Sequence, residues 1–122
     1  MNPKQAVTEW VEGYLDACRT YEPDAILALF THDASYSTSP FDPPVQGREA
    51  IVDYWLEDPP EPFSCDWSIV AAESTVAVVD ARYRYLDANG DTDRAYADLW
   101  VITLDTDGRC REFREHFMRR PA

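Results

Sequence analysis

The chain has 122 residues, of which 45% are hydrophobic and 13% aromatic, a composition that suits one folded domain spanning residues 1–122 with a single core. A formal net charge of -12 argues against a nucleic-acid partner and against binding to an anionic membrane surface, because both are negatively charged. No apolar run approaches the roughly 20 residues of a membrane helix, and the N-terminus does not resemble a signal peptide, so we expect a soluble, cytoplasmic protein.

Two helices and a strand are predicted in the first third of the chain. Asn2 is a suitable N-cap for a helix that continues to about Arg19, with apolar residues at helical spacing along one face. Pro23 is typical of a helix start and predicts a second, shorter helix that ends in the turn 31–33. The segment 34–38 then has the composition of a short strand.

The rest of the chain is predicted to form one more helix and a four-stranded antiparallel meander. The third helix covers residues 48 to about 56, and proline-rich segments on both sides of it cannot continue a helix or strand. The pattern then changes from helical spacing to strand alternation, with an Asn-Gly turn and an Asp-Gly turn between the later strands. The predicted strands are 63–72, 75–86, 92–104 and 109–119.

Three segments resemble a known family. Residues 27–34, LALFTHDA, resemble its second helix running into a strand, and residues 47–55, GREAIVDYW, resemble its "G-x-x-A-I-x-x-Y/F" helix. Asp107-Gly108-Arg109 followed by FREHF at 113–117 is similar to its closing strand. The sequence is therefore identified as similar to the SnoaL-like family, within the nuclear transport factor 2-like (NTF2-like) superfamily.

The resemblance implies an α+β fold of the cystatin-like cone type, in which N-terminal helices pack on a strongly curved antiparallel sheet and enclose a pocket. Polyketide cyclases, ketosteroid isomerase, dehydratases, epoxide hydrolases and non-catalytic binding modules share this fold. The fold does not select among these activities, because function depends on the residues of the pocket.

Strand alternation predicts which side chains face the pocket, since successive residues point to opposite faces. On 92–104 the even-numbered, bulky set is placed inside, with Asp98 between two aromatic residues. On 109–119 we place Phe113, Glu115 and Phe117 inside and the set containing Cys110 and His116 outside. The predicted apolar cup for a small apolar organic ligand comprises Trp10, Tyr14, Phe30, Tyr36, Phe41, Trp55, Tyr83, Tyr96, Trp100, Phe113 and Phe117.

Asp98, Tyr14 and Glu115 are the candidate catalytic residues. A carboxyl between aromatic rings loses hydration, which raises its pKa and suits it to acid-base chemistry. The resemblance implies that Tyr14 matches the helix-one tyrosine of ketosteroid isomerase, and that Asp98 matches its oxyanion-holding acid if the hairpin after it carries two extra residues. The alternative for Asp98 is a structural acid bonded to Tyr14 or Arg94, and the alternative for Glu115 is a salt bridge, for instance to Arg94.

The usual ketosteroid isomerase mechanism is not expected here. Thr38, which we expect to line the pocket, stands where that enzyme has its proton-shuttling aspartate, and a threonine cannot shuttle a proton at neutral pH. Asp42 is close by in the sequence but lies in a proline-rich loop, so it is only a weak replacement. The histidines His32 and His116 are predicted in a turn and on the outer face.

Neither a metal nor another cofactor is expected. Cys18, Cys65 and Cys110 are too far apart in the sequence for a CxxC site, and we expect free thiols in a reducing compartment. Phosphate-binding loops, dinucleotide-binding glycine patterns and zinc motifs are absent from the sequence.

Three functions stay open on these grounds. The first is a cofactor-independent isomerase, cyclase or dehydratase in which Tyr14 and Asp98 hold an oxygen and Glu115 moves a proton. The second is a ligand-binding module without catalysis. The third is an interaction module forming a homodimer through the flat, apolar outer set of the strand 92–104, which includes Leu99.

Overall fold

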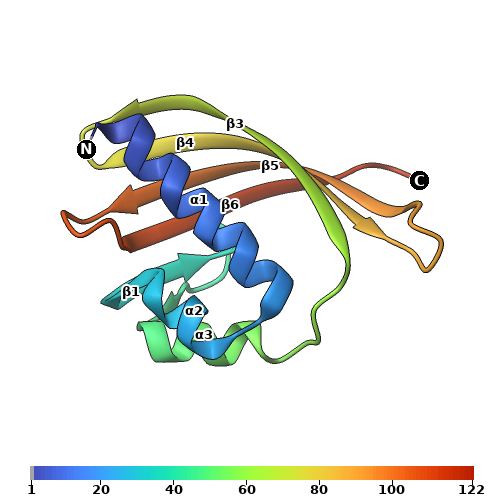
Figure 1. The fold of residues 1–122 in the computed structure, drawn as a ribbon, viewed down its shortest axis with the longest axis horizontal. Coiled ribbons are helices and arrows are strands. Elements are labelled where there is room, and N and C mark those ends of the chain that lie inside the picture. The colour runs from blue at the N-terminus through green and yellow to red at the C-terminus, as the bar shows by residue number, and fades with distance from the viewer. Residues whose placement is uncertain (1) are drawn as a thin grey trace.

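The computed structural model describes residues 2–122 and shows one curved sheet with helices packed against its concave face. The helices are α1 (Pro3–Thr20), α2 (Pro23–Ala28) and α3 (Arg48–Trp55). Helix α1 crosses the long strands, while α2 and α3 lie together at one edge of the sheet (Figure 1). The predicted α+β fold with N-terminal helices on a curved sheet is confirmed.

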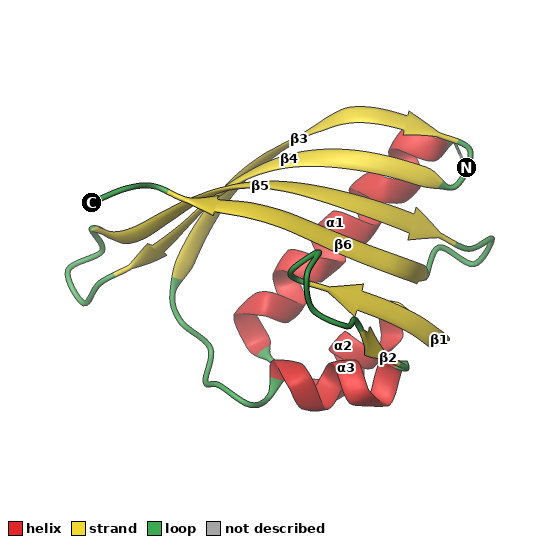
Figure 2. Ribbon diagram, turned by 180° about the vertical axis from the view of Figure 1, so that it is seen from behind, coloured by secondary structure: helices red, strands yellow, loops and turns green. Residues whose placement is uncertain are grey.

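The sheet has six strands in the order β2-β1-β6-β5-β4-β3. The strands β3 to β6 form the predicted antiparallel meander, and β1 adds to its edge in parallel with β6 (Figure 2). Their bounds are β1 (Phe30–Ser37), β2 (Val45–Gln46), β3 (Phe63–Glu73), β4 (Val76–Leu86), β5 (Thr92–Leu104) and β6 (Cys110–Arg119).

Local hydrogen bonds fix both ends of helix α1. The Asn2 side chain accepts a hydrogen bond from the backbone N–H of Gln5 at 2.8 Å, which satisfies one of the free donors of the first turn. The helix closes at Tyr21, which adopts a left-handed conformation with φ 52° and donates its N–H to the carbonyl of Ala17. Its apolar stripe, including Tyr14, is buried against the sheet.

The first edge of the sheet differs from the prediction. Strand β1 begins at Phe30, so residues 31–33 continue the strand and do not form a turn. The reason is tertiary: β1 pairs in parallel with β6, a partner about eighty residues away along the chain. The two-residue strand β2, which pairs with β1 at Ser35 and Tyr36, was not predicted because its sequence lies in the proline-rich stretch.

The predicted alternation holds on β4 and β5 and is interrupted on β6. The even-numbered residues Asp98, Trp100, Ile102 and Leu104 are buried, and Leu99 is exposed. Cys110, predicted outside, is fully buried. Thr103 pairs with Glu112 but Leu104 pairs with Cys110, so the pairing skips Arg111. This irregularity turns Cys110, the first residue of β6, to the inner face.

Aromatic rings fill the space between α1 and the sheet. The ring of Tyr14 lies at the centre, with ring centroids of Trp10, Trp55, Trp100 and Phe113 between 5.1 and 5.4 Å away. Such offset and edge-to-face contacts add to the burial of apolar surface. Within the described part of the chain, no helix is long and apolar enough to cross a membrane.

Candidate functional site

A pocket of about 440 Å³ opens between the concave face of the sheet, helix α1 and the end of α3. The loop from α3 to β3, drawn in green beneath the sheet in Figure 2, supplies part of its rim. All seven tyrosines of the chain line it, together with two tryptophans and five carboxylic acids. The predicted apolar cup is therefore aromatic but also rich in hydroxyl and carboxyl groups.

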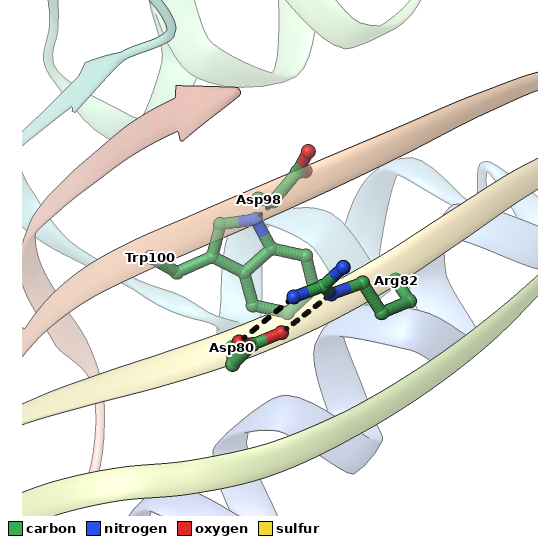
Figure 3. Close-up of polar contacts among 4 residues, drawn as sticks. All are labelled: Asp80, Arg82, Asp98 and Trp100. Atoms are coloured by element: carbon green, nitrogen blue, oxygen red, sulfur yellow. Dashed lines mark hydrogen bonds and ion pairs between the residues drawn. The ribbon is translucent and has the colours of Figure 1, made fainter. Parts of the chain in front are cut away.

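Asp98 and Glu115 meet on the two central strands. Asp98 and Trp100 are two residues apart on β5 and so share a face, and Glu115 on β6 is paired directly with Trp100. The indole Nε1 of Trp100 donates to Oδ2 of Asp98 at 3.2 Å and to Oε2 of Glu115 at 3.2 Å. Figure 3 shows the Trp100 indole against the Asp98 carboxyl, and the Asp80–Arg82 pair on the neighbouring strand β4.

The surroundings of Glu115 favour its protonated form. Burial raises the pKa of Glu115 well above 4.5, and the hydrogen bond with Asp98 and the charge of Asp98 raise this pKa further. The N–H of Trp100 acts in the opposite direction, because it stabilises the ionised carboxylate. The two acids therefore behave as a pair in which one proton is retained.

Arg94 does not neutralise this pair. Among residues 2–122 its ion pairs are with Glu61 and Asp93, and its guanidinium carbon lies 4.5 Å from the ring centroid of Tyr85. The alternative in which Arg94 forms a salt bridge with Asp98 or Glu115 is therefore wrong.

Two buried tyrosine hydroxyls form a second polar group in the pocket. The hydroxyl oxygens of Tyr14 and Tyr36 are 3.1 Å apart. Burial raises the pKa of both phenols well above 10, so both stay neutral and can donate a hydrogen bond. The hydrogen-bond partner of Tyr14 is thus Tyr36, and the alternative in which Asp98 bonds to Tyr14 is wrong.

Two buried polar atoms of pocket residues have no hydrogen-bond partner in the described structure: Nε1 of Trp55 and Oδ1 of Asp98. Trp55 is 7% exposed and Asp98 is 5% exposed, so water cannot readily serve either atom. Unpaired buried donors and acceptors are rare in folded proteins and are concentrated at functional sites.

The structure brings most of the predicted site residues together around this pocket. They are Tyr14, Tyr36, Thr38, Trp55, Tyr83, Tyr96, Asp98, Trp100, Glu115 and Phe117. Thr38 lies at the rim, where its hydroxyl is 3.3 Å from that of Tyr54. Phe117 lines the pocket but is more than half exposed.

Four of the residues predicted for the cup lie elsewhere. Phe41 is 94% exposed and lies in the proline-rich loop between β1 and β2. Trp10 is buried, donates its indole N–H to the Leu29 carbonyl at 2.9 Å and does not line the pocket. Phe113 and Phe30 are fully buried core residues and do not line the pocket.

Sequence reasoning missed several lining residues. Tyr21 enters because the left-handed cap of α1 turns the chain there, and Tyr54 enters from α3. Cys18 also lines the pocket, and burial raises the pKa of its thiol to about 12, which makes it a poor nucleophile at neutral pH. The remaining missed residues are Glu57, Asp58, Pro59, Glu61, Phe63, Tyr85 and Arg94.

The described residues contain no group of three or more acidic, histidine or cysteine side chains arranged to hold a metal ion. All three cysteines are free thiols. Both histidines lie in exposed positions on strands β1 and β6.

Comparison with solved structures shows the same fold in enzymes and in a steroid complex. The epoxide hydrolase/cyclase-like enzyme SalBIII, studied for pyran ring formation in the polyether salinomycin, has a TM-score of 0.77 and 20% identity over 97% of this chain and 95% of its own. An LEH-like epoxide hydrolase of Mycobacterium tuberculosis has a TM-score of 0.69 and 16% identity over 93% and 84%. RV0760c of M. tuberculosis, in complex with estradiol-17beta-hemisuccinate, has a TM-score of 0.70 and 12% identity over 91% and 92%.

These identities are low, so the structural similarities show a shared fold. A comparison with curated proteins gives no match. The model of the SnoaL-like domain matches residues 11–113, which include the second half of α1, strands β1 to β5 and Asp98. This chain therefore belongs to the SnoaL-like domain family.

Proposed function

We propose that this protein binds a small organic molecule in the pocket and catalyses a proton transfer on it without a cofactor, in a reaction of the isomerase, cyclase or dehydratase type. The observation that carries the proposal is the acid pair: Asp98 and Glu115 share the single N–H of Trp100 inside an aromatic pocket. A buried acid that keeps its proton can act as the proton donor while a neighbouring acid acts as the base in one reaction.

The pair suggests a division of roles. The Asp98 carboxylate accepts a proton from a C–H or O–H group of the substrate. The protonated Glu115 delivers its proton to a substrate oxygen, so the total charge of the pair is unchanged by the transfer. The Tyr14 and Tyr36 hydroxyls are neutral donors suited to holding an oxygen that gains negative charge. In this scheme Glu115 acts first as an acid.

The named activities of structural neighbours support this class of chemistry. SalBIII is described as epoxide hydrolase/cyclase-like, and the M. tuberculosis protein as an LEH-like epoxide hydrolase. Both names refer to reactions at an oxygen-bearing carbon, which an acid and a base held in one pocket can catalyse. For this chain such a substrate is a proposal.

The non-catalytic binding module is the second candidate, and Thr38 favours it. The hydroxyl of Thr38 lies beside the Tyr54 hydroxyl at the rim, and no carboxyl from β1 lines the pocket. A pocket without a base on this strand can bind a ligand without turning it over. In that case binding survives Asp98→Asn and no substrate is converted.

The deciding experiment is a turnover screen with small epoxy alcohols, enones and β-hydroxy ketones, followed by mass spectrometry. We expect conversion of a member of this set, a bell-shaped pH profile, and loss of at least about 100-fold in kcat for Asp98→Asn and for Glu115→Gln. Glu112→Gln, on the outer face of the same strand, is the matched control and should retain activity. Conversion that survives both pocket substitutions would refute the proposed roles.

We also propose that two copies pair through the outer face of the sheet. Leu99 is 46% exposed there, and Met118 is more exposed still. The apolar stripe of β5 is narrower than predicted, because Asp80 and Arg82 form an ion pair on β4 and Arg114 on β6 pairs with Glu112. The predicted cytoplasmic location stays a prediction.

A further inference from the structure

The charges of the pocket are strongly one-sided. Five carboxylic acids line it, Asp98 and Glu115 inside and Glu57, Asp58 and Glu61 on the loop between α3 and β3. Arg94 is the one basic side chain among the described lining residues, and it is already paired with Glu61 and Asp93. A negatively charged ligand would therefore meet repulsion both at the rim and at the base of the pocket.

Two buried polar atoms that lack a partner among the described residues, Nε1 of Trp55 and Oδ1 of Asp98, call for complementary polar groups on a ligand. The Trp55 indole can only donate, so its buried Nε1 requires an acceptor. The Asp98 carboxylate can only accept, and its Oδ1 is buried without a partner. The proton on Glu115 and the N–H of Trp100 occupy only some of the acceptor positions of the two carboxyl groups. The remaining positions of the two acids have no donor within residues 2–122.

Trp55 and Trp100, whose N–H binds Asp98, both contact the ring of Tyr14. The Tyr14 ring centroid is 5.4 Å from that of Trp55 and 5.2 Å from that of Trp100, which holds Asp98. A ligand about the size of two fused aromatic rings can reach both Trp55 and Asp98 within a pocket of about 440 Å³.

We propose that the pocket selects an oxygenated molecule without negative charge, which places a carbonyl or ether oxygen on the Trp55 N–H and a hydroxyl or amine donor on Asp98. The inference rests on the proposed function only in taking this pocket as the binding site, and it names the class of substrate. Trp55 is then a specificity-determining residue, and the rim acids exclude carboxylates and phosphates.

The test compares two probes of the same size. A hydroxy-acetylnaphthalene has a hydroxyl and a ketone, and the matching hydroxynaphthoate replaces the ketone with a carboxylate. Binding to the full chain is measured by calorimetry at low and at high salt. We expect the ketone to bind at least about 10-fold more tightly at low salt, and we expect salt to narrow the difference because it screens the acids.

Two substitutions then test how much the Trp55 N–H contributes to binding of the ketone. Trp55→Phe removes the N–H and keeps an aromatic ring, and should weaken binding of the ketone by about 5- to 10-fold. Trp67→Phe, at a partly buried tryptophan outside the pocket, is the matched control and should leave binding unchanged. If Trp55→Phe does not fold, the indole N–H resonance of Trp55 in the wild-type protein gives the same information, because it should shift on addition of the ketone.

Several results would overturn the inference: equal or tighter binding of the naphthoate, no binding of either probe at millimolar concentration, or an unshifted Trp55 resonance in the bound state. The proposed function is tested by a different result. Selective binding of the ketone combined with no turnover in the substrate screen would retain the inference and remove the catalytic role.

Discussion

Replacing Glu115 by glutamine should stabilise the protein, and the gain should grow with pH. The pKa of Glu115 is raised in the folded state by burial and by Asp98, so the folded protein retains a proton that the unfolded chain releases above a pH of about 4.5. The free energy of unfolding of the wild type therefore falls as pH rises from there towards the folded pKa. Glutamine does not titrate, so the variant lacks this loss.

The size of the effect follows from the geometry. Oδ2 of Asp98 and Oε2 of Glu115 are each 3.2 Å from the same nitrogen, which places them at most twice that distance apart. Two full charges about 6 Å apart repel by about 3 kcal/mol at an effective dielectric constant of about 20. The stability gained by Glu115→Gln should be close to zero at pH 4 and should approach or exceed this value above neutral pH, because the separation of about 6 Å is a maximum and burial of Glu115 adds to the effect.

Urea denaturation at pH 4, 6 and 8 measures this difference without adding salt that would screen the charges. Glu112→Gln, at the outward-facing acid three residues earlier on β6, is the control and should change stability by less than about 0.5 kcal/mol at each pH. A Glu115→Gln protein that is no more stable than the wild type at pH 8, or a gain independent of pH, would refute the acid pair.

Three further outcomes are expected. Trp100→Phe should lower the free energy of unfolding by about 2–4 kcal/mol in urea, because both acids lose their N–H donor and the core loses volume; a loss below 1 kcal/mol would contradict the shared hydrogen bonds. Asn2→Ala should cost about 1 kcal/mol in the same assay through the lost cap of α1, whereas Asn2→Gly should cost less. Leu99→Glu should convert the proposed dimer to a monomer in light scattering, with Val70→Glu as an exposed control, and an unchanged mass would place the contact elsewhere.

Local signals in the sequence were sufficient for most of the fold. The cap at Asn2, the glycine turns and strict alternation each act within a few residues, and they located α1 and the strands β3 to β6 to within about two residues. The start of β1 could not be found this way, because residues 31–33 extend the strand only when β6 lies beside them. Cys110 was assigned to the wrong face for a related reason: nothing in the sequence marks the irregularity near Arg111.

The candidate site residues on strands were predictable, because alternation fixes which side chains face inward. Those on loops were not predictable. Asp98 and Glu115 follow from alternation on two neighbouring strands, as does their place among aromatic rings. Phe41 was placed in the pocket by its apolar character alone, but a proline-rich loop has no periodicity that fixes a direction. The acids of the α3–β3 loop were missed for the same reason, and with them the one-sided charge of the rim.

The acid pair exists because three features of the β5–β6 hairpin coincide. Asp98 and Trp100 share a face through their spacing of two residues, and the pairing of Trp100 with Glu115 places the second acid opposite the indole. The irregularity near Arg111 lies between the turn and this point, so it sets which residues of β6 face inward. An unbroken ladder from Leu104 would place Arg114 opposite Trp100 and turn Glu115 to the outer face. The bulge is therefore part of the site: it is what puts a second carboxyl, and not an arginine, beside Asp98.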